Sequence, residues 1–98
     1  MSTNDPAIEA LGDHDYLVHI PQDEDLIAIR IRANPEAVAR IAGPHADETS
    51  VVAATVTYLT VRQRPDDLPE QLDLDDVIAA YSDYVDELQT KFGHPMNA

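Results

Sequence analysis

The chain has 98 residues, no cysteine and a formal net charge of −13, which excludes disulfides and thiolate metal sites and disfavours non-specific binding to phosphate backbones or anionic lipids. This length fits a single small domain with one hydrophobic core. No run reaches the ~20 consecutive apolar residues of a membrane-spanning helix, and the acidic start does not resemble an export signal, so we expect a soluble, cytoplasmic protein.

The charges are distributed unevenly along the chain. Residues 1–25 contain seven acids and no base, whereas residues 26–64 contain all five arginines and only three acids. Residues 65–98 contain nine acids, and Lys91 is their only base. A proteome-wide bias toward acidic surfaces would produce the same net charge, so net charge alone does not establish a function.

The N-terminal segment, residues 1–14, is predicted to be loosely ordered. Asp5 and Pro6 are typical of a helix start, and Gly12 is typical of a helix end. At most, one short and fraying helix is expected here.

A β-hairpin is predicted next. Residues 16–20 and 26–32 are rich in β-branched and apolar residues, and the polar residues 21–25 between them have the length of a hairpin turn. Successive strand side chains alternate between faces, so the isoleucines of the second strand should face the core. Arg30 and Arg32 should then lie on the opposite face.

A short helix is predicted over residues 34–42. Asn34 is a favoured N-cap, Pro35 is favoured at the first helical position, and Glu36 complements the positive end of the helix dipole. Gly43 and the proline after it should end the helix.

Residues 51–61 form an ambiguous segment. β-branched residues are abundant in it, and residues 56–61 are compatible with a third strand. Acids precede the segment, and Arg62 and Arg64 follow it before Pro65, which is the charge order that complements a helix dipole. We therefore favour a helix.

The clearest predicted element begins at Asp73, a typical cap residue, and ends before Gly93. Apolar residues recur within it at the spacing of one helix face. They are Ile78, Tyr81, Val85, Leu88 and Phe92. We predict one long amphipathic helix, with Tyr84 beside this stripe as an exposed aromatic residue.

Together these elements predict an α+β fold, in which an N-terminal β-hairpin packs against one short and two longer α-helices. The two longer helices are expected to form an antiparallel helical hairpin. The folded domain should span residues 15–93, followed by a flexible C-terminus at residues 94–98.

The sequence contains no pattern that is typical of catalysis or metal binding. Its three glycines are too few for a Gly-rich phosphate cradle, and no serine lies in a Gly-x-Ser-x-Gly turn. Asp13, His14, Asp15 and His19 are metal-capable residue types, but their spacing matches no specific ligand set. We therefore expect neither enzymatic activity nor a metal or other cofactor.

The segment from Asp66 to Glu87 carries nine acids and no base. Carboxylates steer a basic surface toward them, and an amphipathic helix can lie in a partner's groove. The leading hypothesis is a non-catalytic interaction or regulatory protein that docks a basic protein partner through this region. The residues assigned to that contact are Asp66, Asp67, Glu70, Asp73, Asp75, Asp76, Asp83, Tyr84, Asp86 and Glu87. The apolar stripe serves either the core or a homodimer contact, and the sequence leaves both open.

Arg30 and Arg32 lead to an alternative hypothesis. They lie on the polar face of a predicted strand that precedes two helices, and this order over residues 27–63 resembles that of ribbon-helix-helix DNA-binding proteins. The resemblance implies a two-fold dimer, formed through the strand, that places both arginines in the major groove, as in antitoxin-type regulators. A preceding strand at residues 16–20 would compete for the edge that the dimer needs. The competing explanation is that both arginines pair with the acidic turn of Asp23, Glu24 and Asp25 or with the acidic tail at residues 65–98.

Overall fold

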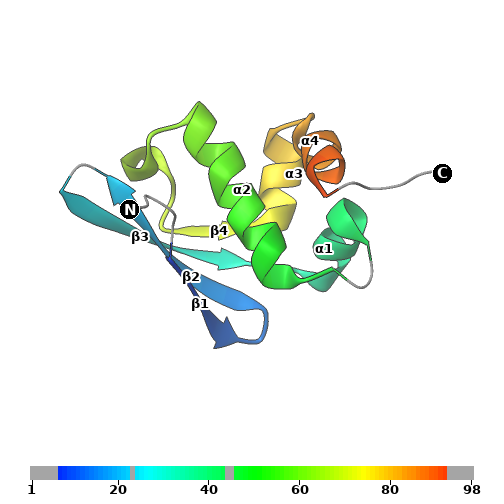
Figure 1. The fold of residues 1–98 in the computed structure, drawn as a ribbon, viewed down its shortest axis with the longest axis horizontal. Coiled ribbons are helices and arrows are strands. Elements are labelled where there is room, and N and C mark those ends of the chain that lie inside the picture. The colour runs from blue at the N-terminus through cyan, green and yellow to red at the C-terminus, as the bar shows by residue number, and fades with distance from the viewer. Residues whose placement is uncertain (1–6, 23, 44–45, 93–98) are drawn as a thin grey trace.

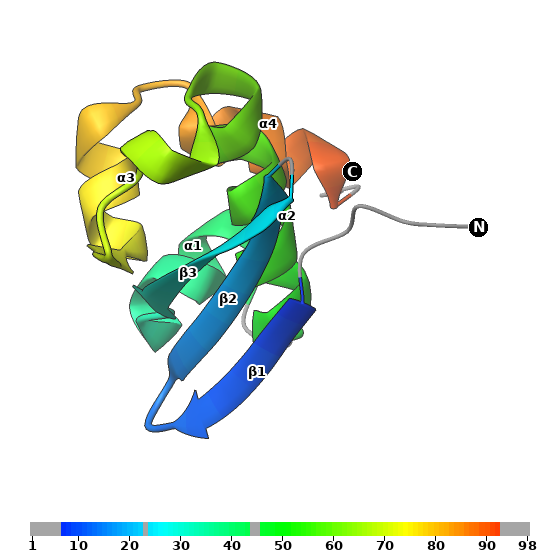
Figure 2. The same ribbon diagram turned by 90° about the vertical axis from the view of Figure 1, so that its left-hand side faces the viewer.

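The computed structural model describes residues 7–22, 24–43 and 46–92. The strands are β1 (Ala7–Gly12), β2 (Asp15–Gln22), β3 (Asp25–Arg32) and β4 (Gln71–Asp73). The helices are α1 (Pro35–Ala42), α2 (Glu48–Arg62), α3 (Leu74–Ala80) and α4 (Tyr84–Lys91), with a 3₁₀ turn η1 (Pro65–Asp67). The α+β class is confirmed, and Figure 2 shows the helices gathered on one side of the sheet. Within the described ranges, no helix is long and apolar enough to cross a bilayer.

The predicted hairpin is present and forms the centre of the sheet. The strand order is β1-β2-β3-β4, and β2 pairs antiparallel with β1 and β3. Val18, Ile29 and Ile31 are at most 2% exposed, because the alternation of the strands directs them toward the helices. Arg30 and Arg32 lie on the opposite face, which no helix covers, as predicted.

β1 corrects the prediction for the N-terminal segment. Ala7–Gly12 is a strand and not a short helix, and its Ile8 pairs with Val18 and is partly buried against the core. Both residues of the turn, Asp13 and His14, have positive φ, at 53° and 67°, as type I′ hairpin turns require. Pairing with β2 therefore overrides the local helix preference, and the folded domain includes residues before 15. The predicted cap residues 5–6 and the flexible terminus 94–98 lie outside the described residues.

α1 and α2 are both helices, as the sequence favours. The side-chain oxygen of Asn34 accepts a hydrogen bond from the backbone N–H of Glu36 at 3.0 Å, so Asn34 caps α1 as predicted. α2 is helical throughout, with Glu48 in its first turn and Arg62 in its last, which complements the dipole. The alternative of a strand at residues 56–61 is therefore wrong. α2 lies centrally among the helices (Figure 1).

The predicted long C-terminal helix is instead two helices. α3 ends at Ala80, and the extended backbone of Tyr81, at φ −126° and ψ 109°, redirects the chain before α4. Ser82 and Asp83 are weak helix formers, because their side chains compete for backbone hydrogen bonds. The fully buried residues of the two helices are Leu74, Val77, Tyr84 and Leu88. The other residues of the predicted stripe, Ile78, Tyr81, Val85 and Phe92, are partly buried against the core.

Tyr84 is the largest correction within this region. The sequence pattern predicts an exposed residue, but the side chain is 0% exposed and its ring lies 5.1 Å from the ring of Tyr58. Its hydroxyl lies 2.6 Å from the hydroxyl of Thr55, which donates to the backbone oxygen of Val51. Tyr84 can then donate to Thr55, so the break before α4 places this residue in the core with its polar atom satisfied.

β4 has no counterpart among the predicted elements. Its residues Gln71, Leu72 and Asp73 pair parallel with Arg30, Ile31 and Arg32 of β3. The backbone N–H of Arg30 donates to the carbonyl of Glu70 at 2.8 Å and holds the start of β4 in register. Three residues are too few for a strand pattern in the sequence, and their partner lies about 40 positions away, so only the tertiary fold reveals them.

Arg62 ties the end of α2 to the start of α4. Its guanidinium carbon lies 3.7 Å from the centroid of the Tyr58 ring, and its nitrogens lie 3.5 Å from Asp83 and 3.1 Å from Glu87. It also donates to the backbone oxygen of Tyr58 at 3.1 Å. The cation–π contact lies within α2, and the two ion pairs join the end of α2 to the start of α4.

Replacing Arg62 by methionine should lower the free energy of unfolding by ~1 kcal/mol. The cation–π contact and the two ion pairs each contribute less than ~1 kcal/mol, and their sum is of that order. Methionine retains apolar contact with Tyr58, so the loss reports mainly on the charge. Urea denaturation measures the change. The control is Arg64→Met, because Arg64 is 69% exposed and should change stability by less than ~0.5 kcal/mol. Equal losses for the two variants would contradict a specific role for Arg62.

Candidate functional site

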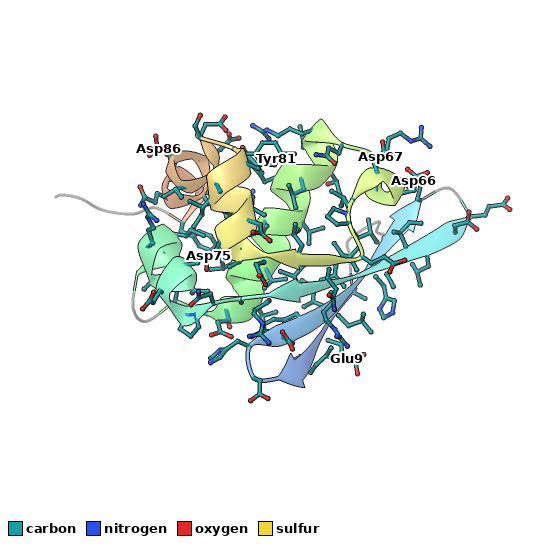
Figure 3. The ribbon with its side chains drawn as sticks, turned by 180° about the vertical axis from the view of Figure 1, so that it is seen from behind. Glu9, Asp66, Asp67, Asp75, Tyr81 and Asp86 are labelled. Atoms are coloured by element: carbon teal, nitrogen blue, oxygen red, sulfur yellow. The ribbon has the colours of Figure 1, made fainter. Side chains whose placement is uncertain are left out.

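The acidic residues predicted to bind a partner do not form one continuous patch. Figure 3 shows Asp66 and Asp67 on η1 at one side of the molecule and Asp86 on α4 at the other, with Asp75 near the start of α3. They lie on η1, β4, α3 and α4 and on the segments that connect these elements, and residues 66–87 are called the acidic band below. Tyr84, assigned to the same contact, lies in the core and is not available to a partner.

Four of these acids are engaged by neighbouring side chains. The Gln22 side chain, together with Arg64 at 3.4 Å, holds the pKa of the Asp66 carboxyl below its usual value. A hydrogen bond from the Tyr58 hydroxyl at 2.6 Å lowers the pKa of Asp83, and Arg62 adds to the effect. The other two are Glu87, which pairs with Arg62, and Asp75, which accepts a hydrogen bond from the side-chain amide of Asn34 at 2.7 Å.

Six carboxylates of the band have no cation within ion-pair distance among the residues that the structure describes. They are Asp67, Glu70, Asp73, Asp75, Asp76 and Asp86. All are exposed except Asp73, which is half-buried. The band therefore carries much of the excess negative charge of the molecule at its surface.

An open pocket of about 320 Å³ lies where β3 and β4 run side by side toward the start of α3. Its lining residues come from four elements: Asp15, Arg30, Arg32, Gln71, Leu72, Asp73 and Asp76. Leu72 is the only apolar side chain among them. Two of the predicted acidic residues and both predicted DNA-binding arginines thus lie in the same pocket, a juxtaposition that no pattern in the sequence predicts.

The two arginines of the pocket have different surroundings. Arg32 lies between Asp15 and Asp73 in the strand register, and its Nε is 3.2 Å from the Asp15 carboxylate. Arg30 lies between Leu17 and Gln71, and no described carboxylate lies within 4.0 Å of its nitrogens. Arg32 thus pairs with Asp15, which lies in neither the hairpin turn nor the acidic tail, and among the described residues neither arginine pairs with an acid of those two segments.

The arrangement of strands differs from that of ribbon-helix-helix proteins. β3 carries Arg30 and Arg32, but β2 occupies one of its edges and β4 occupies the other. A dimer formed through β3 would therefore require one of these neighbours to leave. Acids of β4 and α3 also lie beside both arginines, and they would repel a phosphate backbone.

Two of the four metal-capable residues, His14 and Asp15, are used in other contacts. His14 Nδ1 lies 2.7 Å from the carboxylate of Glu48, and Asp15 pairs with Arg32. The same Glu48 accepts a hydrogen bond from the Tyr16 hydroxyl at 2.8 Å. These contacts tie the β1–β2 turn to the first turn of α2 and account for the residue types there.

Comparison with known proteins adds no relative. No protein-family model matches the chain, and no curated protein or solved structure matches it significantly. The charges and geometry of the described residues are therefore the basis for assigning a function.

Proposed function

We propose that this chain is a cytoplasmic, non-catalytic interaction protein that docks a basic protein partner through its acidic C-terminal region. The observation that carries the proposal is a set of six carboxylates in the acidic band, on η1, β4, α3, α4 and the segment before β4, that no described cation neutralises. Acids that only stabilise the fold would be expected to have partners within it, as Asp83 has in the Tyr58 hydroxyl and Asp66 has in Arg64.

The arrangement of these acids supports a docking role. Carboxylates that no cation neutralises attract a basic surface over about a Debye length, which accelerates encounter with a basic partner and discourages acidic partners. Because they are spread over four consecutive elements, they favour an extended surface contact over a contact within one pocket. Four of the ten residues predicted to contact the partner are left out of the proposed contact. Tyr84 is buried, and Asp66, Asp83 and Glu87 already have partners within the fold.

The test compares two triple variants with the same net charge. The first, Asp67→Asn with Glu70→Gln and Asp86→Asn, removes three charges from the band. The second removes three exposed charges elsewhere, through Glu9→Gln, Asp13→Asn and Asp47→Asn. A partner captured from native lysate at low salt, eluted by raised salt and purified, should bind the first variant at least tenfold more weakly than wild type, measured by calorimetry.

The control variant should bind within about twofold of wild type, since exposed charges act mainly within a Debye length of ~10 Å at 0.1 M salt. Equal weakening by both variants would show attraction to net charge alone and would overturn the docking site. If DNA elutes from the wild-type column and a variant with Arg30→Ala and Arg32→Ala retains none, the DNA-binding alternative is supported instead. A column that retains nothing basic at low salt would contradict the proposal directly.

A further inference from the structure

The pocket between β3, β4 and α3 keeps opposite charges apart. Arg30 has no ion-pair partner among the described residues, and neither do Asp73 and Asp76, although all three line one space of about 320 Å³. Oppositely charged side chains on one surface gain little by pairing in water, so their separation is stable. It leaves a guanidinium and two carboxylates facing the same volume.

The chemistry of these groups specifies the ligand. A guanidinium binds a carboxylate with two parallel hydrogen bonds, whereas a pair of carboxylates accepts hydrogen bonds from an ammonium group. A purely anionic ligand would be repelled, because the pocket has three aspartates and two arginines. A purely cationic ligand would leave Arg30 unpaired and adjacent to like charge. Only a group that carries both charges satisfies the whole lining.

The shape of the pocket favours a protein segment over a metabolite. Small-molecule sites are mostly apolar and enclose most of their ligand, but this pocket is open and Leu72 is the only apolar residue in its lining. Asp73 and Asp76 belong both to the pocket and to the acidic band. Two further acids of the band are their neighbours in the sequence, since Glu70 precedes β4 and Asp75 precedes Asp76. A partner that docks on the band can therefore reach the pocket with an exposed loop or terminus.

We propose that this pocket binds an ampholytic segment of the docked partner, in which a lysine pairs with Asp73 and Asp76 and a nearby glutamate or aspartate pairs with Arg30. The inference rests on the proposed docking function and specifies the chemistry of the partner. Arg32 is already paired with Asp15, so Arg30 is the arginine of the pocket that remains available to the carboxylate of the segment. Among basic partners, the protein thus prefers those in which an acidic residue near the lysine can pair with Arg30.

The probes are three capped pentapeptides that differ in charge alone. The first has glycine at positions one, three and five, lysine at position two and glutamate at position four. In the second, glutamine replaces the glutamate, and in the third, glutamine replaces the lysine. Titrations followed by amide NMR shifts of residues 30–32 and 71–76 should show at least fivefold tighter binding of the first peptide than of either other.

Single substitutions should remove this preference selectively. In Arg30→Gln, the first peptide should bind no more tightly than the peptide that lacks glutamate, but still more tightly than the peptide that lacks lysine. In Asp76→Asn, the first peptide should lose its advantage over the peptide that lacks lysine and keep its advantage over the peptide that lacks glutamate. Matched controls are Arg40→Gln and Glu36→Gln, since both residues are exposed on α1 outside the pocket. The controls should retain the fivefold preference, and dispersed spectra of all variants will show that they are folded.

The outcomes separate this inference from the proposed function. Equal affinity for the three peptides, shifts outside the pocket, or loss of preference in the control variants would overturn the inference. The docking function would still stand if the purified partner lost affinity for the variant neutralised at Asp67, Glu70 and Asp86. Conversely, selective peptide binding without that loss would support the pocket and reject docking by the band.

Discussion

Replacing Tyr84 by alanine is expected to lower the free energy of unfolding by ~3–5 kcal/mol, which is typical of a buried aromatic residue replaced by alanine. Its side chain is 0% exposed and is the bulkiest of the fully buried set. The substitution removes the ring contact with Tyr58 and leaves the Thr55 hydroxyl without its partner at 2.6 Å. The loss is severe for a domain of this size, whose total stability is expected to be ~5–15 kcal/mol.

Urea or thermal denaturation followed by circular dichroism measures this loss. Tyr84→Phe is the matched control, because it keeps the ring and deletes only the hydroxyl, and it should cost ~1 kcal/mol. A loss below ~1.5 kcal/mol for Tyr84→Ala, well under the range for a buried aromatic residue, would contradict the burial of this side chain. That result would restore the sequence-based expectation of an exposed aromatic.

The second large effect is loss of stability in alkali. Burial raises the pKa of Tyr84 from 10.0 to about 12, and burial together with the hydrogen bond to Asp83 raises the pKa of Tyr58 to about 12. Above pH 10 the tyrosines of the unfolded chain release protons that the folded chain still holds. Stability is therefore fully present below pH 10 and falls as the pH rises toward 12, by ~3 kcal/mol for Tyr84 alone.

Denaturation midpoints measured in urea between pH 9 and 12 test this effect. Tyr84→Phe cannot ionise at this position, so its stability should fall less steeply than that of wild type across the same interval. Adding Tyr58→Phe should reduce the slope further. Parallel curves for wild type and Tyr84→Phe would show that the Tyr84 hydroxyl is not held in its neutral form by the core.

Local patterns in the sequence are sufficient for several elements. Alternation of apolar residues places the isoleucines of β3 in the core and Arg30 and Arg32 on the open face. The capping residue Asn34 locates α1 because its bond to Glu36 spans only two positions. The acids before α2 and the arginines at its end identify a helix in spite of its β-branched residues. Each signal involves residues within a few positions of one another.

The sequence by itself likewise determines the charge asymmetry and the absence of cysteine, and these two properties limit the chemistry that the protein can perform. Tertiary structure decides the rest, because the deciding contacts join distant residues. Pairing with β2 makes Ala7–Gly12 a strand, and partners on α2 draw Tyr84 into the core and divide the last helix. The parallel pairing of β4 with β3 brings Asp73 and Asp76 beside Arg30, about 40 residues away, and creates the pocket. Periodicity describes one element at a time, whereas the lining of this pocket comes from four elements that only the tertiary fold brings together.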